Sequence, residues 1–301
     1  MYFIKIQAGE NMAEDRKRKR KFSFPSLTRG RKIALLILAV MLILILPGLY
    51  NRLKIVRYKV DSQKVNAPVR IVLVTDLHSC KYGKEEKELI EAIEKENPNL
   101  LLLGGDIFDD KLSSDNTEAF LSGISGKYPT YYVTGNHEYW SSKEDFESDL
   151  RILEKYGITR LRGEVKLLEI NGNSIAVAGV DDPDLWYHEE GDFYQQLQTV
   201  TQNIPQDAFS ILLTHRPELY NTYLGRGFDL VLAGHAHGGQ WRIPGILNGL
   251  YAPNQGIFPK YAGGRYSDGV TTMIVSRGLA RESTLIPRIY DRPELVVIEI
   301  E

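Results

Sequence analysis

Short polar segments that carry aspartate, asparagine and histidine follow five apolar runs of the chain. The runs are 70–75, 100–103, 131–134, 210–214 and 230–233, and the polar residues that follow them are Asp76, His78, Asp106, Asp109, Asn136, His137, His215, His235 and His237. Five of the six histidines of the protein lie in these segments, and His188 is the exception. Because ligands collect at the carboxyl ends of strands in open α/β sheets, we expect the five segments to converge on one crevice.

The donor types in these segments predict a metal centre. Asp, Asn and His together form a mixed oxygen and nitrogen set that suits divalent Mn, Fe, Co or Zn. Asp76-x-His78 and His235-x-His237 each place two donors on one side of an extended segment, because side chains two residues apart point the same way. One ion requires about four to six donors, and these nine residues offer at least seven, so two ions that share one carboxylate are the economical solution. Two ions about 3.5–4 Å apart lower the pKa of a bridging water and hold a phosphoryl group for in-line attack.

The elements that must position these donors alternate between strands and helices. The five apolar runs are typical of strands buried on both faces. Amphipathic stretches at 85–96, 115–124 and 141–156 predict helices, with Ser142 placed to cap the third. Alternating residues on either side of Asn171-Gly172-Asn173 predict a hairpin, and 271–276 and 294–300 predict two further strands. We therefore expect one α/β domain in which two mixed sheets face each other with helices outside, a four-layer sandwich.

A different kind of segment precedes this domain. Residues 33–46 lack polar side chains, and we interpret 33–50 as a transmembrane signal-anchor helix after a basic cytoplasmic tail, 1–32. Eighteen residues rise about 27 Å as a helix, against a hydrocarbon core of roughly 30 Å. Residues 51–69 are interpreted as a linker, and 70–301 as the catalytic domain. Nine Lys or Arg lie at 16–32 and five at 52–64, so the denser side predicts a cytoplasmic N-terminus and an extracytoplasmic domain.

Two alternatives stay open for this segment. A cleaved signal peptide also has a short apolar core, but no Ala-x-Ala-like pair follows the run, and this favours a retained anchor. Translation starting at Met12 in place of Met1 is the other alternative.

Composition excludes several classes of protein. Hydrophobic residues make up 43% and charged residues 25%, close to the globular average, which argues against disorder and fibrous folds. The single cysteine, Cys80, excludes an internal disulfide. Residues 60–301 carry 23 basic and 36 acidic residues, a net charge of −13, which argues against a nucleic-acid partner. Such a domain can still bind an anionic substrate if bound cations reverse the local field.

The motifs in their order along the chain resemble those of the calcineurin-like metallophosphoesterases. They are Asp76-x-His78, Gly105-Asp106-x-x-Asp109, Gly135-Asn136-His137-Glu138, His215 and Gly234-His235-x-His237. The segments 238–240, 276–278 and 292–294 resemble the membrane-associated bacterial branch, which includes UDP-2,3-diacylglucosamine hydrolase-like phosphodiesterases. The resemblance covers 70–301 and implies a sandwich of two mixed sheets flanked by helices.

The resemblance also implies a role for each site residue. Asp76, His78 and His237 would bind one divalent ion, and Asn136, His215 and His235 the other. Asp106 would bridge the two ions. His137 would protonate the leaving alkoxide, and Asp109 would orient His137 and raise its pKa. Hydroxide held by the metals would attack the phosphorus, without a covalent phosphoenzyme.

The expected function is that of a membrane-anchored binuclear-metal phosphoesterase acting on a phosphodiester or pyrophosphate. Its substrate would be a phosphate ester near the bilayer, plausibly lipid-linked or a UDP-sugar-lipid of the envelope, and no obligate protein partner is evident. A secreted phosphomonoesterase and a non-catalytic metal-binding scaffold are the alternatives. Arg277 and Arg292 are typical either of a phosphate clamp or of structural salt bridges.

Overall fold

The computed structural model describes residues 28–281 and 286–301, and the described residues separate into two units, one up to Ile43 and the other from Leu44 onward. The basic run 16–21 and Met12 lie outside the described residues. Helix α1 (Arg29–Ile45) begins in the first unit and continues into the 3₁₀ turn η1 (Leu46–Leu49). Together, Arg29–Leu49 form a helix of 21 residues that is long and apolar enough to cross a membrane by length and composition.

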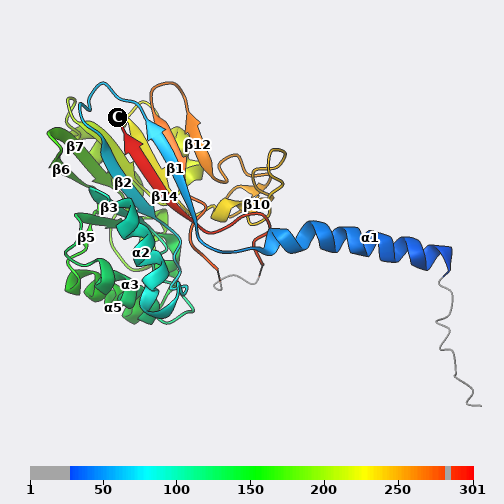
Figure 1. The fold of residues 1–301 in the computed structure, drawn as a ribbon. Helices are drawn as coiled ribbons and strands as arrows, with labels where there is room; N and C mark the ends of the chain where they lie inside the picture. Colours follow the sequence, from blue (N-terminus) through cyan, green and yellow to red (C-terminus); the bar gives the residue numbers. More distant parts are fainter. Residues whose placement is uncertain (1–27, 282–285) are drawn as a thin grey trace, which may run out of the picture. The chain divides into compact units, whose positions relative to one another are not determined.

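Two six-stranded mixed sheets form the body of the second unit (Figure 1). The first has the order β1-β14-β2-β3-β4-β5, with bounds Lys54–Val60, Glu294–Ile300, Val69–Val74, Leu100–Gly104, Thr130–Val133 and Thr159–Arg160. The second has the order β12-β13-β9-β8-β7-β6, with bounds Gly264–Ser267, Thr272–Val275, Leu230–Ala233, Phe209–Leu213, Asn173–Gly179 and Glu164–Ile170. β2, β3 and β4 run parallel, as do β7, β8, β9 and β13. Their carboxyl ends therefore lie along common edges.

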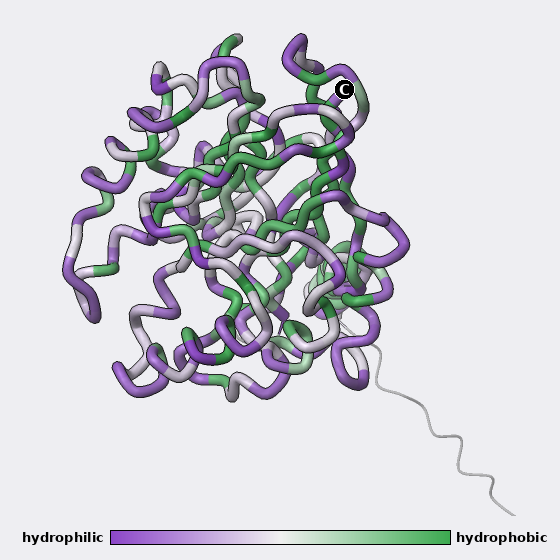
Figure 2. The backbone as a smooth tube through the Cα atoms, turned by 90° about the vertical axis from the view of Figure 1, so that its left-hand side faces the viewer, coloured by the Kyte–Doolittle hydropathy of each residue, from purple (hydrophilic) through white to green (hydrophobic). Residues whose placement is uncertain are grey.

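Alternate residues of the strands fill three apolar layers. Ile71 and Leu73 of β2 point into a cluster shared with Ile211 and Leu213 of β8, so the two sheets face each other. Val72 and its outward neighbours pack instead against helices on the far side of the first sheet. Each large aliphatic side chain buried in this way contributes about 1.5–3 kcal/mol. In Figure 2 the hydrophobic segments gather in the interior strands, while the outer turns are hydrophilic.

Helices cover both outer faces, which completes the predicted four-layer sandwich. On the first sheet lie α2 (Lys87–Glu96), α3 (Asp115–Ile124) and α5 (Lys143–Lys155). On the second lie α6 (Phe193–Asn203) and α7 (Tyr220–Tyr223). The short helix α4 (Asn136–Trp140) follows β4 directly, and the small hairpin β10 (Tyr251–Ala252) and β11 (Gly256–Ile257) lies outside the sheets. The fold prediction is confirmed, although α6 and α7 were not anticipated.

Two local predictions are confirmed in detail. Ser142 Oγ accepts a hydrogen bond from the Asp145 N–H at 3.1 Å, as expected of the cap of α5. The hairpin of β6 and β7 turns through Asn171 (φ +53°) and Gly172 (φ +76°), both in the left-handed region that a two-residue turn of this kind requires.

The segment interpreted as a linker, 51–69, contains a strand. β1 (Lys54–Val60) pairs in parallel with β14 at the edge of the first sheet. Its exposed residues alternate with half-buried ones such as Tyr58, as expected of an edge strand with one face toward solvent. Without its partner strand, which lies at the other end of the chain, this pattern is hard to separate from an extended linker.

Candidate metal centre

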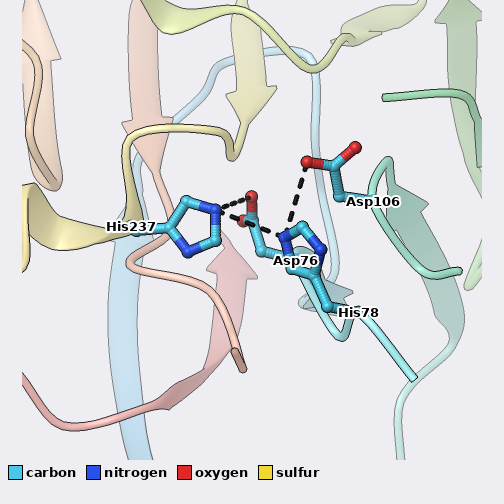
Figure 3. Close-up of side chains that lie close together, drawn as sticks. All are labelled: Asp76, His78, Asp106 and His237. Carbon is cyan, nitrogen blue, oxygen red and sulfur yellow. Dashed lines mark hydrogen bonds and ion pairs between the residues drawn. The ribbon is translucent and has the colours of Figure 1, made fainter. Parts of the chain in front are cut away.

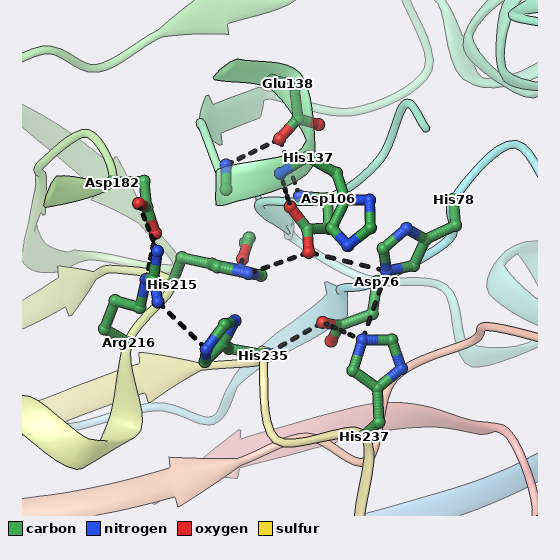
Figure 4. Close-up of polar contacts among 12 residues, drawn as sticks. Asp76, His78, Asp106, His137, Glu138, Asp182, His215, Arg216, His235 and His237 are labelled. Atoms are coloured by element: carbon green, nitrogen blue, oxygen red, sulfur yellow. Dashed lines mark hydrogen bonds and ion pairs between the residues drawn. The ribbon is translucent and has the colours of Figure 1, made fainter. Parts of the chain in front are cut away.

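The predicted donors meet at the carboxyl edges of the two facing sheets (Figure 4). The first sheet supplies the residues that follow β2, β3 and β4, and the second supplies those that follow β8 and β9. Asp76, His78, Asp106 and His237 form one group in which the nearest ligand atoms all lie within 4.8 Å of one another. Asp106, His215 and His235 form a second group of the same kind, so Asp106 belongs to both.

The first group surrounds a small space between the two sheets (Figure 3). His78 Nε2 lies 3.5 Å from Asp106 Oδ2 and 3.3 Å from His237 Nε2. His237 Nε2 in turn lies 3.6 Å from Asp76 Oδ1. Two imidazole nitrogens this close cannot both carry a proton toward each other, so the arrangement is suited to a shared cation.

Hydrogen bonds on the far side of two rings select the atom that faces the centre. His78 Nδ1 lies 2.9 Å from Asp109 Oδ2, and His215 Nδ1 lies 2.9 Å from the Gly104 carbonyl oxygen. Because both partners are acceptors, each Nδ1 carries a proton, and each Nε2 is the nitrogen that can bind an ion once it is deprotonated. A carboxylate or carbonyl behind a histidine is the usual support of a metal-binding imidazole.

The second group has a cationic neighbour. Arg216 Nη1 lies 3.1 Å from His235 Nε2, and Asn254 Oδ1 lies 2.9 Å from the same nitrogen. Asp182 holds the guanidinium with two hydrogen bonds, one of 2.8 Å to Nη2. In the tautomer whose Nε2–H donates to Asn254 Oδ1, Nδ1 presents the lone pair that can bind an ion. Sequence reasoning missed Arg216 and Asp182, although Arg216 directly follows His215.

Several buried acceptors in the centre have no hydrogen-bond partner. They are Asp76 Oδ2, Asp106 Oδ2, Asn136 Oδ1 and His215 Nε2. Asn136 opens helix α4, and the N–H of its neighbour His137 donates to Asp106 Oδ1 at 2.9 Å. Asp106 Oδ2 and His215 Nε2 lie 3.1 Å apart without forming a hydrogen bond, and Asp76 Oδ2 and Asn136 Oδ1 have no hydrogen-bond partner at all. Buried polar atoms are normally satisfied, so this concentration of unsatisfied atoms favours a cation-binding site. The residues therefore fit a centre of divalent metal ions.

Histidine side chains balance the negative charge of the buried carboxylate at the middle of the centre. Burial would raise the pKa of Asp106, but the His215, His137 and His78 imidazoles outweigh it and hold that pKa well below its usual value. Burial opposes protonation of His215 as well, yet the Asp106 carboxylate raises the pKa of His215 to about 10. The proton on His215 thus balances the negative charge of the Asp106 carboxylate. A bound metal ion would supply that positive charge in place of the proton.

His235 and His237 show the opposite tendency. Burial lowers the pKa of both side chains well below the usual value, and the positive charges of Arg216 and His78 respectively add to the effect. Both imidazoles are therefore neutral, which is the form that binds metal.

Backbone geometry at the centre is unusual. Five predicted ligands, Asp76, His78, Asp106, His235 and His237, have φ between +45° and +65°. Non-glycine residues in this region store about 1–3 kcal/mol each and persist where the surrounding structure fixes them. A Cβ on Gly135 would lie 2.2 Å from Asp106 Oδ1, so the loop after β4 approaches the carboxylate as only glycine permits.

His137 is near the centre, and its nearest carboxylate is Asp110. His137 Nδ1 lies 2.6 Å from Asp110 Oδ1 but 3.7 Å from Asp109 Oδ2. Asp109, expected to orient His137, instead contacts His78. The two acids are adjacent in sequence, and the turn after β3 decides which ring each one reaches.

Glu138 is a further residue to which the sequence assigned no role. Its carboxylate accepts backbone N–H bonds from Gly135, Asp106, Ile107 and Phe108 at 2.7–3.1 Å. Burial, and then the charge of Asp106, raise its pKa to about 7. Glu138 thus ties the loop after β3 to the loop after β4. The signal was available, since Glu at the third position of a helix is typical of a capping box.

The remaining candidates lie outside the centre. His188 Nε2 lies 2.9 Å from the Ser141 carbonyl oxygen, and its ring packs on Phe146. Arg277 bonds Asp291 at 3.2 Å, and Arg292 donates to the backbone carbonyls of residues 52 and 53. Both arginines thus have structural partners.

Comparison with known proteins adds the following. Residues 69–239 match the calcineurin-like phosphoesterase family. An uncharacterized metallophosphoesterase of Aquifex aeolicus is 30% identical over 276 residues, which are 87% of this chain and 98% of that protein. Phosphodiesterase YaeI of Escherichia coli is 26% identical over 259 residues, 84% of this chain and 89% of that protein. A dimetal phosphatase structure from Danio rerio is 14% identical with a TM-score of 0.43, and covers 70% of this chain and 87% of that one. The matches establish a family and not the narrower UDP-2,3-diacylglucosamine hydrolase-like branch.

Proposed function

We propose that this chain, a metal-dependent phosphoester hydrolase that belongs to the calcineurin-like phosphoesterase family, cleaves a phosphodiester or pyrophosphate bond at two divalent metal ions. In this proposal Asp76, His78 and His237 hold one ion. Asn136, His215 and His235 hold the other, and Asp106 holds both. The observation that carries the proposal is the set of orphaned buried acceptors on these residues.

The metal ions, when bound, supply Lewis-acid charge to the phosphoryl oxygens and lower the pKa of water. The chain's own residues fix where the ligand atoms lie. Asp109 holds His78, and the Gly104 carbonyl holds His215, each through the ring nitrogen that faces away from the centre. Loss of such a partner typically lowers metal affinity or activity by roughly 10–100-fold.

His137 is proposed as the proton donor to the leaving group. It is partly exposed, and its ring lies edge-on to His78 with centroids 4.4 Å apart. It forms a third close group with His78 and Asp109 but is in neither of the two groups that share Asp106, so it borders the centre. Asp110 accepts from Nδ1, which leaves Nε2 to deliver a proton to the leaving alkoxide. We therefore assign the orienting role to Asp110 and the support of His78 to Asp109.

The proposal also includes a membrane location. The helix Arg29–Leu49 would anchor the chain, and the greater number of basic residues before it favours an extracytoplasmic catalytic domain. A centre held beside a bilayer suits a lipid-linked phosphate ester, including UDP-sugar-lipid compounds. We therefore propose a lipid-linked phosphate ester as the substrate class.

Metal content and turnover of the purified full chain test the proposal together. We expect two equivalents of divalent metal and faster hydrolysis of bis(p-nitrophenyl) phosphate than of p-nitrophenyl phosphate. His215→Ala should lose both metal and turnover, whereas His188→Ala, a histidine outside the centre, should keep both. Preference for the monoester would contradict the diesterase assignment, and metal without turnover of any ester would indicate a scaffold.

A further inference from the structure

A hollow with almost entirely apolar walls lies outside the two sheets. Its volume is about 610 Å³, and its walls are Leu44, Ile45, 241–244, Leu247, Leu250, Ile289 and Tyr290. Arg242 contributes the one charged group in this lining. The volume falls within the range of about 300–1,000 Å³ that is typical of small-molecule sites. The lining therefore selects an apolar ligand.

Hydrogen bonds hold the walls of the hollow in place. The Tyr290 hydroxyl donates to the Leu44 carbonyl, and the Tyr290 N–H donates to the Gly48 carbonyl at 2.7 Å. A Cβ on Gly48 would lie 2.8 Å from Ile289 Cγ2, so the two segments touch closely. The hollow is thus preformed, which lowers the entropic cost of binding.

The rim of the hollow exposes large apolar side chains. Ile243 is 51% exposed and Ile246 beside it is 85% exposed, and Trp241 is also exposed. Contiguous exposed apolar surface is unusual in a protein that meets only water, and marks an interaction site.

The position of the hollow along the chain indicates what covers it. Leu44 and Ile45 end the apolar run 33–46, which the proposed function places in the bilayer. The Arg292 guanidinium lies 4.8 Å from the centre of the Tyr50 ring, and Tyr with Arg is typical of a membrane–water interface. The hollow would therefore open where the hydrocarbon of the bilayer begins.

The same loop connects the hollow to the metal centre. His237 begins the short turn η5 (His237–Gly239), and both Trp241 and Leu250 donate backbone hydrogen bonds to the Gly239 carbonyl, at 2.7 and 3.0 Å. The wall of the hollow and a proposed metal ligand are thus parts of one fixed piece of backbone.

We infer that this hollow binds the hydrocarbon chain of a lipid phosphoester substrate drawn from the bilayer, an inference that rests on the proposed function. The ester bond of that lipid would then lie toward the loop that carries His237. A water-soluble ester would use the metal centre without the hollow.

Fluorescence quenching tests binding without any need for turnover. The full chain, in vesicles that contain phosphatidylcholine brominated on its acyl chain, should show quenching of tryptophan emission. The quenched fraction should fall in Trp241→Phe, because Trp241 lines the hollow, but should be unchanged in Trp186→Phe, whose exposed ring stacks on Tyr187 instead. Equal quenching in wild type and Trp241→Phe would overturn the inference.

A matched pair of esters tests whether the bound chain belongs to the substrate. Hexadecyl and ethyl p-nitrophenyl phosphate share a leaving group and differ in chain length alone. Ile243→Asp should raise KM for the hexadecyl ester, relative to that for the ethyl ester, by about tenfold. Leu167→Asp, at an equally exposed apolar position on β6, should leave the ratio unchanged. An unchanged ratio in Ile243→Asp, even with quenching of Trp241, would overturn the assignment of the hollow to the substrate.

These experiments distinguish failure of the lipid-site inference from failure of the proposed function. If the wild-type chain hydrolyses neither ester, the proposed function fails whatever the quenching shows. If it hydrolyses both with the same KM and Trp241 is not quenched, the function stands and the hollow is not a lipid site.

Discussion

Two neighbouring regions of the molecule bury acidic side chains and neutralise them by different means. Asp181 and Asp182 lie just after β7 and are fully buried, and each meets a guanidinium, from Arg160 and Arg216 respectively, at 2.8 Å. Asp76 and Asp106 are equally buried. Among the residues that the structure describes, their ion-pair partners are histidines.

The difference shows how a cation site is distinguished from a structural salt bridge. Arginine stays charged under all ordinary conditions and satisfies a buried carboxylate permanently. Histidines around a carboxylate do so only when protonated, and here Asp76 Oδ2 makes no hydrogen bond while Asp106 Oδ2 contacts only histidine nitrogens. A region that uses arginine is complete, while one that uses histidine has room for an external cation.

Substitution of one acid in each region should have opposite consequences, and this is the largest effect that we expect. Asp76→Asn should lose metal and essentially all activity, because the charge that holds an ion is removed. Asp181→Asn should keep its metal but lose about 1–3 kcal/mol of folding free energy, because Arg160 loses one of its two carboxylate partners and keeps Glu189. Metal analysis and chemical denaturation measure the two outcomes. Metal loss in Asp181→Asn would erase the distinction between the regions.

His137→Ala should separate metal binding from catalysis. The variant should retain its metal, since His137 is in neither of the two groups that share Asp106, although its ring also lies close to His78 and Asp109. Its kcat should fall by about 10²–10⁴-fold for a diester with an alkyl leaving group, because general-acid catalysis is lost. The decrease should be smaller for bis(p-nitrophenyl) phosphate, whose leaving group needs no proton. A variant that loses metal would show that His137 is a ligand.

The adjacent acids Asp109 and Asp110 provide a finer test. Asp109→Asn should weaken metal binding by about 10–100-fold, because it supports His78. Asp110→Asn should leave metal affinity unchanged and lower kcat, because its carboxylate contacts His137. Metal titration and steady-state kinetics of the two variants distinguish these effects. The reverse result would assign Asp109 to His137 after all.

A buried acid in a third region has neither an arginine partner nor a place in a metal-ligand group among the described residues. Asp149 of α5 is 4% exposed and accepts a hydrogen bond from Ser114 at 2.8 Å. Burial, and to a lesser degree the charge of Asp145, raise the pKa of Asp149 to about 7.

The sign of the resulting pH dependence is fixed by this shift. The folded state holds the Asp149 proton between pH 4 and 7 while the unfolded chain releases it, so the group destabilises the fold as pH rises through that range. Asp149→Asn should therefore be more stable than wild type by at least about 1 kcal/mol at pH 8, with the difference vanishing near pH 4. Thermal denaturation at the two pH values measures it. An equal difference at both would show that Asp149 is not protonated in the fold.

Much of the candidate metal centre was predictable because it depends on strand ends. Buried strands are recognised by continuous apolar residues, as in 100–103, and parallel strands bring their carboxyl ends to one edge. The histidines after β8 and β9 could therefore be joined with the acids after β2 and β3 although they are far apart in the sequence.

The parts that sequence reasoning missed depend on contacts that no local pattern encodes. Asp109 and Asp110 are chemically identical neighbours, and only the turn after β3 directs one to His78 and the other to His137. Strand β1 is recognisable through its pairing with β14, at the opposite end of the chain. Arg216 resembles any surface arginine until Asp182 and His235 are brought beside it.

The most direct test of the metal centre is an anomalous-difference map from crystals of the full chain grown with Mn²⁺. Two peaks about 3.5–4 Å apart should lie on either side of Asp106, one beside Asp76, His78 and His237 and the other beside Asn136, His215 and His235. A single peak, or peaks away from Asp106, would contradict the binuclear centre.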